Sequence, residues 1–110
     1  MMIVGAIPVE RKEVYLVGSQ TDLGHFLSRM DSDFRDLFKR KSNVRDGEKI
    51  WTKYDLVEGG NISIEYDPRK VRAEISVSPN VPEDITNYLQ WMEYKTKARI
   101  NADYERRVYS

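Results

Sequence analysis

The sequence predicts an α+β domain in which an antiparallel sheet of about five strands is covered on one face by two helices. The first observation is a run of three strands between Ile50 and Ser78, where apolar and polar residues alternate. Such alternation places apolar side chains on one sheet face and polar side chains on the other. The second observation is that one segment before this run and one after it have apolar residues at helical spacing. The expected order in one domain, residues 1–110, is strand, strand, helix, three strands, helix.

The first two strands are expected at residues 2–9 and 14–17. Both segments are apolar, and the charged residues 10–13 between them suit an exposed turn, so we expect a hairpin. Pro8 cannot donate a ladder hydrogen bond and therefore belongs at a strand end or on a sheet edge.

The first helix is expected to begin at Ser19, which forms an S-x-x-D capping box with Asp22. We expect it to end near residues 39–41, whose positive charges suit a helix C-terminus, and residues 42–49 to form a polar loop. Its apolar stripe, which we expect to enter the core, consists of Leu23, Phe26, Leu27, Met30, Phe34, Leu37 and Phe38.

Two turns connect the three central strands. Glu58-Gly59-Gly60 supplies residues that tolerate positive φ, and Asp67-Pro68 begins the second turn with a proline of fitting φ. The turns and the alternation together predict a three-stranded meander with one apolar and one polar face.

The second helix is expected from about Glu83 to beyond Asn101, started by Pro82 as its first residue or by an Asn80–Glu83 capping box. The apolar pattern weakens toward the C-terminus, so the last turns either project from the domain or fray. The stripe that docks this helix consists of Ile85, Tyr88, Leu89, Met92 and Thr96.

Composition excludes several classes of function. Eighteen basic and eighteen acidic residues cancel, so the chain has no net field that attracts nucleic acid or an anionic membrane. No cysteine is present, which excludes disulfides, thiolate metal sites and thiol catalysis. The N-terminus has no signal-peptide pattern and no apolar run is long enough to span a bilayer, so we expect a cytoplasmic protein.

We expect no catalytic site, metal site or cofactor. His25 is the only histidine and falls on the polar side of the first helix, without a partner that makes it a general base. Asp31, Asp33 and Asp36 fan around the same helix rather than a loop that wraps a cation. Gly59-Gly60 precedes a strand, so it is a turn and not a phosphate loop.

A surplus of aromatic residues favours a binding function. Trp91 and Tyr94 form a second stripe on the second helix, rotated from the docking stripe, and this stripe either packs on the first helix or meets another chain. In the strand alternation, Trp51 falls on the polar face of the sheet, together with Lys53 and Asp55. Tryptophan and tyrosine are enriched at binding hot spots, so we expect a protein partner or a homodimer.

The alternative is a small homo-oligomeric protein that associates with nucleic acid, or a phage-type regulator. Its phosphate contacts would come from a basic cluster interleaved with tyrosines near the C-terminus, although acidic residues dilute the cluster. The basic residues are Lys95, Lys97, Arg99, Arg106 and Arg107.

Residues 14–30, VYLVGSQTDLGHFLSRM, resemble a segment of small bacterial toxin-immunity proteins. The resemblance rests on Gly18, Ser19, Leu23 and Leu27 and on the element order that follows: a strand ending in Gly-Ser, a leucine-rich helix, and further strands. It implies a protein that inhibits a partner toxin by covering its site, without catalysis. It transfers no contact residues to this chain.

Overall fold

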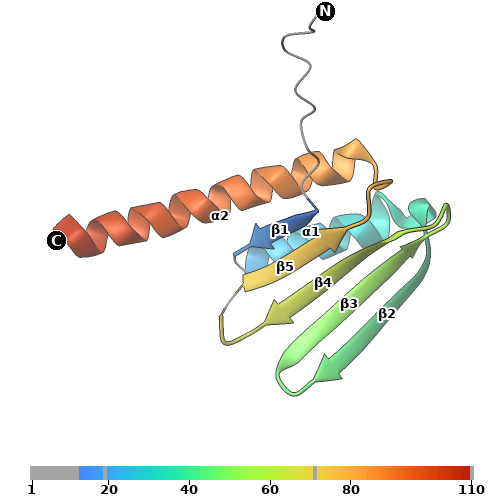
Figure 1. The fold of residues 1–110 in the computed structure, drawn as a ribbon, viewed down its shortest axis with the longest axis horizontal. Coiled ribbons are helices and arrows are strands. Elements are labelled where there is room, and N and C mark those ends of the chain that lie inside the picture. The colour runs from blue at the N-terminus through green and yellow to red at the C-terminus, as the bar shows by residue number, and fades with distance from the viewer. Residues whose placement is uncertain (1–12, 19, 71, 110) are drawn as a thin grey trace, which may run out of the picture.

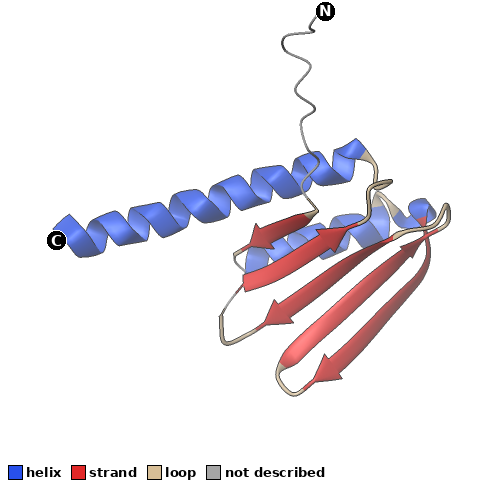
Figure 2. Cartoon of the chain, viewed as in Figure 1, coloured by secondary structure: helices blue, strands red, loops and turns tan. Residues whose placement is uncertain are grey.

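The structure is a computed structural model that describes the backbone of residues 13–18, 20–70 and 72–109, and the side chains of these residues up to Ala102. It confirms the α+β fold, with five antiparallel strands and two helices (Figures 1 and 2). The elements are β1 (Val14–Val17), α1 (Gln20–Ser32), a 3-10 turn (Arg35–Leu37), β2 (Phe38–Asp46), β3 (Lys49–Leu56), β4 (Asn61–Asp67), β5 (Arg72–Val77) and α2 (Glu83–Tyr109).

The strands form one sheet in the order β1-β5-β4-β3-β2. The predicted meander of β3, β4 and β5 is confirmed, with Thr52 opposite Ile64 and Ile64 opposite Ile75 on the apolar face. Gly59 and Gly60 have φ angles of +92° and +89°, which side chains with a Cβ rarely adopt. Their positive φ explains why two glycines stand at this turn.

The prediction that the first helix continues to residues 39–41 is wrong. Helix α1 ends at Ser32, and the expected loop at 42–49 belongs mostly to strand β2 and its turn into β3. Gly47 is the first of the two residues that connect β2 to β3, and its φ of +63° is one that glycine adopts without a steric penalty. Pairing with β3 therefore overrides the helical spacing of the apolar residues that follow Ser32.

This correction changes which segment supplies the fifth strand. The expected hairpin paired residues 2–9 with β1, but residues 2–9 lie outside the described part of the chain. In the structure the fifth strand is β2, and β1 pairs with β5 instead, with Tyr15 opposite Ile75. The predicted N-cap, Ser19, also lies outside the described residues.

The core lies between the apolar sheet face and the two helices. Phe26 of α1 stacks on Tyr88 of α2 with ring centroids 6.2 Å apart, so both helices meet in the same layer. Phe34 is only partly buried at the rim, because the chain leaves α1 before this residue. The fully buried large side chains are Tyr15, Val17, Phe26, Met30, Tyr54, Ile62, Ile75, Val81, Ile85, Leu89 and Met92.

Helix α2 lies beside strand β1 at one end of the sheet, while α1 lies behind the sheet in the view of Figure 1. The backbone of α2 continues as a helix to Tyr109, and its C-terminal half extends past the sheet (Figure 1). The sheet thus has one edge beside a helix, at β1, and a second edge at β2.

Candidate protein-binding surfaces

Helix α2 has one buried and one exposed side. Ile85, Leu89 and Met92 are fully buried, which confirms the predicted docking stripe. Trp91 and Tyr94 are 53% and 68% exposed. Of the two alternatives for the second stripe, packing on the first helix is therefore wrong for these two residues, and their rings face solvent.

The exposed rings form an ordered pair, which we call the aromatic platform. Trp91 and Tyr94 stack with centroids 6.0 Å apart and planes 17° from parallel. The Nζ atom of Lys95 lies 5.6 Å from the centre of the Trp91 ring, within the range of a cation–π contact. Stacking and the cation restrict both side chains, so a partner would lose less side-chain entropy on contact.

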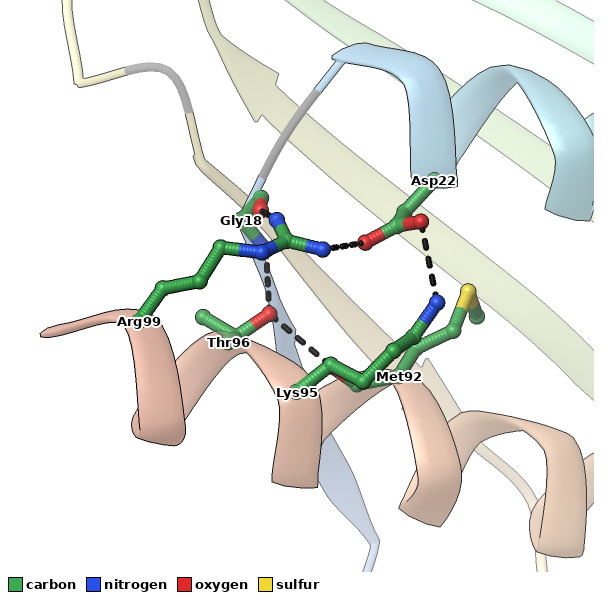
Figure 3. Close-up of polar contacts among 6 residues, drawn as sticks. All are labelled: Gly18, Asp22, Met92, Lys95, Thr96 and Arg99. Carbon is green, nitrogen blue, oxygen red and sulfur yellow. Dashed lines mark hydrogen bonds and ion pairs between the residues drawn. The ribbon is translucent and has the colours of Figure 1, made fainter. Parts of the chain in front are cut away.

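A polar cluster fixes α2 against α1 and thereby positions the platform (Figure 3). The carboxylate of Asp22 accepts hydrogen bonds from Arg99 at 2.8 Å and from Lys95 at 3.2 Å. Arg99 also donates to the carbonyl oxygen of Gly18 at 2.7 Å. Burial raises the pKa of Asp22, but the hydrogen bonds from Arg99 and Lys95 outweigh it and hold the pKa below its usual value.

A second set of contacts joins α2 to the backbone of β1. The N–H of Leu16 donates to Glu93 at 2.8 Å, and the N–H of Gly18 donates to Thr96 Oγ1 at 2.9 Å. Both N–H groups point away from β5, toward the outer side of β1, where the described part of the sheet has no further strand. Side chains of α2 take the place of a neighbouring strand, and they close this edge of the sheet.

The residues of the nucleic-acid alternative are engaged within the chain as far as the structure describes them. Lys95 and Arg99 bind Asp22, and Lys97 lies 3.6 Å from Glu93. The side chains of Arg106 and Arg107 lie outside the described part. Lys95 and Arg99 thus stabilise the attachment of α2, whereas Lys97 is exposed and pairs within the helix.

The second predicted aromatic site lies on the open sheet face. Trp51 is 41% exposed and stands opposite Val44 of β2, which is 61% exposed. Lys53 and Asp55 share this face and approach within 3.7 Å of each other. The structure therefore confirms that Trp51 leaves the sheet on its polar side.

The two aromatic sites are not adjacent. Trp51 lies on β3, and β4 and β5 separate this strand from β1, where α2 packs. The structure groups Trp51 with Lys53 and Asp55, and it groups Trp91 with Tyr94. They are therefore two separate candidate surfaces.

The residues considered for chemistry have ordinary surroundings. His25 is exposed on α1. Asp31 accepts hydrogen bonds from Lys41 at 2.9 Å and from the Tyr54 hydroxyl at 3.0 Å, and Asp33 pairs with Arg29. Among the described residues, no three histidine or acidic side chains gather as a metal site would require.

A groove of about 270 Å³ separates α1 from the inner face of β3 and β4. Its walls offer apolar contact and a few hydroxyl and amide groups, and no carboxylate or imidazole lines it. The lining residues are Gln20, Leu23, Gly24, Leu27, Ile50, Thr52, Ile64 and Tyr66.

Sequence reasoning did not find the residues that attach α2. The sequence assigns Asp22 to a capping box with Ser19, and it shows Glu93 only as one of the acidic residues that dilute the basic cluster. Thr96 was assigned to the docking stripe, which is confirmed by its 2% exposure, but its bond to Gly18 was not foreseen. The sequence signal that could have found them is the position of these polar residues on or beside a docking stripe, because a buried polar side chain needs a hydrogen-bond partner.

Of the described helices, none has both the length and the apolar character that crossing a membrane requires. Comparisons with protein-family models, with curated proteins and with solved structures found no match to this chain.

Proposed function

We propose that this protein is a non-catalytic protein-binding module and that the aromatic platform of α2 is its main contact surface. The observation that carries the proposal is the stacking of Trp91 and Tyr94 on a helix that is anchored at neighbouring positions, while both rings face solvent. Exposed aromatic pairs of this kind are unfavourable in water and become favourable when a partner covers them.

The surroundings of the platform suit an interface. Asn87 and Gln90 on the preceding turn are exposed and polar, as is Lys97 on the following turn. A polar rim around an aromatic centre is the usual arrangement at protein–protein hot spots. The attachment of α2 through Asp22 and Glu93 holds the platform in place, which reduces the entropy lost on binding.

The specific form of the proposal is an inhibitor of the immunity type, which neutralises a partner toxin by covering its site. Its support is the resemblance of residues 14–30 to toxin-immunity proteins. The form predicts that a gene for a toxin lies beside the gene for this chain, and that co-expression of the two restores growth. A neighbouring toxin that still kills in the presence of this protein would refute the immunity form and leave the binding module untouched.

The platform is tested with the double variant Trp91→Ala/Tyr94→Ala. Truncation of a hot-spot aromatic costs at least about 2 kcal/mol of binding, so affinity should fall at least about thirtyfold. The partner is first captured on immobilised wild-type protein and purified, and its affinity for each variant is then measured by titration. Light scattering after size exclusion reports self-association, because a second copy is the other candidate partner.

Two controls make the result specific. Val57→Ala removes a side chain of similar exposure, 58%, in the β3–β4 turn, which is not part of the aromatic platform, and should leave affinity unchanged. Trp51→Ala tests the sheet face. Loss of affinity with Trp51→Ala, and not with the α2 double variant, would transfer the contact to Trp51, Lys53 and Asp55. A lower melting temperature of the double variant would show instead that the platform stabilises the monomer.

A further inference from the structure

The two edge strands of the sheet, β1 and β2, differ in whether their outward backbone groups have partners. At β1, side chains of α2 bond the outward backbone groups of Leu16 and Gly18. At β2, no strand or helix within the described residues pairs with the outer side, although this strand has nine residues, Phe38–Asp46. Long open edge strands are templates for an added strand.

The ladder shows which backbone groups of β2 face outward. Val57 donates its N–H to Leu37, toward the β2 side, whereas Leu56 donates to Gly60, on the β4 side. Because these directions alternate along a strand, residues 51, 53 and 55 of β3 bond their opposite residues 44, 42 and 40 of β2. The outward N–H and C=O groups of β2 therefore belong to Lys41, Asn43 and Arg45.

The charge of this edge is positive. Strand β2 carries four basic residues against one acidic residue, Asp46. A hollow of about 270 Å³ lies beside its beginning, and a fifth cation, Arg35, lines it. Asp31 also lines this hollow and pairs with Lys41 at 2.9 Å, so the other cations carry the excess positive charge. The basic residues of the strand are Lys39, Arg40, Lys41 and Arg45.

The same charges disfavour a second copy of this chain as the added strand. An antiparallel pair of β2 strands centred on Asn43, which matches the outward backbone groups of both strands, places Arg45 opposite Lys41 of the other copy. Like charges directly opposite each other destabilise a strand pair. Basic edge residues thus disfavour pairing of two β2 edges and at the same time favour an acidic strand.

We propose that β2 docks an extended acidic segment of a partner protein, which adds to the sheet as a sixth strand. Backbone bonds to Lys41, Asn43 and Arg45 hold the segment, and its carboxylates meet the basic side chains. On the open face, an apolar side chain of the segment lies beside Val44, which already neighbours Trp51. This surface is separate from the aromatic platform, so either proposal can fail without the other.

The probe is an eight-residue peptide, acetyl-Glu-Val-Glu-Thr-Glu-Val-Glu-Thr-amide, titrated into the full-length isotope-labelled chain and followed by amide NMR and hydrogen exchange. In the free protein the amides of Lys41, Asn43 and Arg45 should exchange fast, and the peptide should protect them. Ser42 and Val44, whose amides bond β3, serve as internal controls and should be protected throughout. A peptide of the same sequence with every backbone nitrogen methylated keeps its charges and should not bind.

Two pairs of variants separate backbone pairing from charge. Asn43→Pro removes one outward N–H, which an edge strand tolerates, and should weaken peptide binding at least about fivefold relative to Asn43→Ala. Both variants lose the hydrogen bond between Thr52 and the Asn43 side chain, so that loss cancels. Arg45→Glu should weaken binding by about three- to tenfold, whereas Lys70→Glu in the β4–β5 turn changes net charge equally and should have little effect.

Four results would overturn the proposal. Slow exchange of all three outward amides in the free protein would mean that the edge is already paired. Absence of peptide binding at about 1 mM, a free energy of only about −4 kcal/mol, would mean that the edge does not take an acidic strand. Equal binding of the methylated peptide would show that charge alone attracts it. Equally tight binding of octauridine RNA at β2 would identify a nucleic-acid surface instead.

Discussion

Glu93 accepts a hydrogen bond from the backbone N–H of Leu16 across 2.8 Å, so a helix carboxylate occupies the place of a strand carbonyl. Thr96, about one turn later on α2, does the same for Gly18. The helix pitch of about 5.4 Å is close to the two-residue repeat of a strand, about 6.6 Å. Successive turns of α2 can therefore meet successive outward N–H groups of β1.

Glu93→Ala should destabilise the domain by about 1.5–3 kcal/mol, because it removes a charged acceptor and leaves a half-buried N–H unsatisfied. Urea unfolding measures the loss. Glu93→Gln keeps an acceptor oxygen and should cost less than the alanine variant. Lys97→Ala removes only the exposed partner of Glu93 and should stay within about 0.5 kcal/mol of wild type. Equal losses for Glu93→Ala and Lys97→Ala would contradict the role of the Leu16 bond.

Gly18→Ala should also destabilise the protein, by about 1–3 kcal/mol, because the new Cβ would lie 2.8 Å from Cγ2 of Thr96. Thr96 is stiff at χ1 and bonded at Oγ1, so it cannot move aside easily.

The close contact at Gly18 can be relieved by a second substitution. Thr96→Ser removes Cγ2 and keeps the hydroxyl, so it should recover part of the loss in the Gly18→Ala background. Gly24→Ala is the matched control in α1: apart from its chain neighbours and the backbone of its own helix, no atom lies within 4 Å of its Cβ position, and helix propensity should raise stability by about 1 kcal/mol. Failure of Thr96→Ser to recover stability would show that steric contact is not the cause.

Most of the sheet could be predicted from local sequence, and one strand could not. The alternation around Ile64 and Ile75 and the glycines at the β3–β4 turn are local signals, and they predicted the meander. Strand β2 is polar on both faces, with Ser42 and Asn43 at its centre, so no alternation marked it. Its only local signal was the Asp-Gly turn, and its stability comes from pairing with β3.

The candidate site shows the same division. That Trp91 and Tyr94 lie off the docking stripe of α2 followed from helical periodicity alone. The contacts that position this helix did not, because Asp22 and Arg99 are 77 residues apart and meet only in the folded chain. Periodicity shows which side of a helix is polar, but it does not show which buried group a polar side chain will bond.

The end of α1 predicts a difference between two phenylalanines. Phe26 is fully buried and stacks on Tyr88, so Phe26→Ala should cost about 3–5 kcal/mol. Phe34 lies beyond the helix at the rim and is only partly buried, so Phe34→Ala should cost about 1–2 kcal/mol. Urea unfolding measures the loss for both variants. Because both are Phe→Ala, a difference between the two losses reports the position and not the type of substitution. Equal losses would place Phe34 inside the core and would restore the longer helix.

The stabilisation that Asp22 provides should depend on pH in a defined direction. Burial opposes its charge, but Arg99 and Lys95 together hold its pKa below the usual value in the folded protein. As the pH falls, the unfolded chain therefore takes up the proton first, and the folded state loses its advantage. The contribution is complete above the ordinary pKa of about 4 and disappears as the pH falls through the lower pKa of the folded protein.

The measurement is the difference in unfolding free energy between wild type and Asp22→Asn as a function of pH. Wild type should be more stable by a constant amount above about pH 5, and the difference should shrink below about pH 4. In an Arg99→Gln background the difference should be smaller at neutral pH, because the strongest hydrogen bond to the carboxylate is gone. A difference that stays constant into strong acid would mean that Asp22 acts through packing, and that its charge does not join α1 to α2.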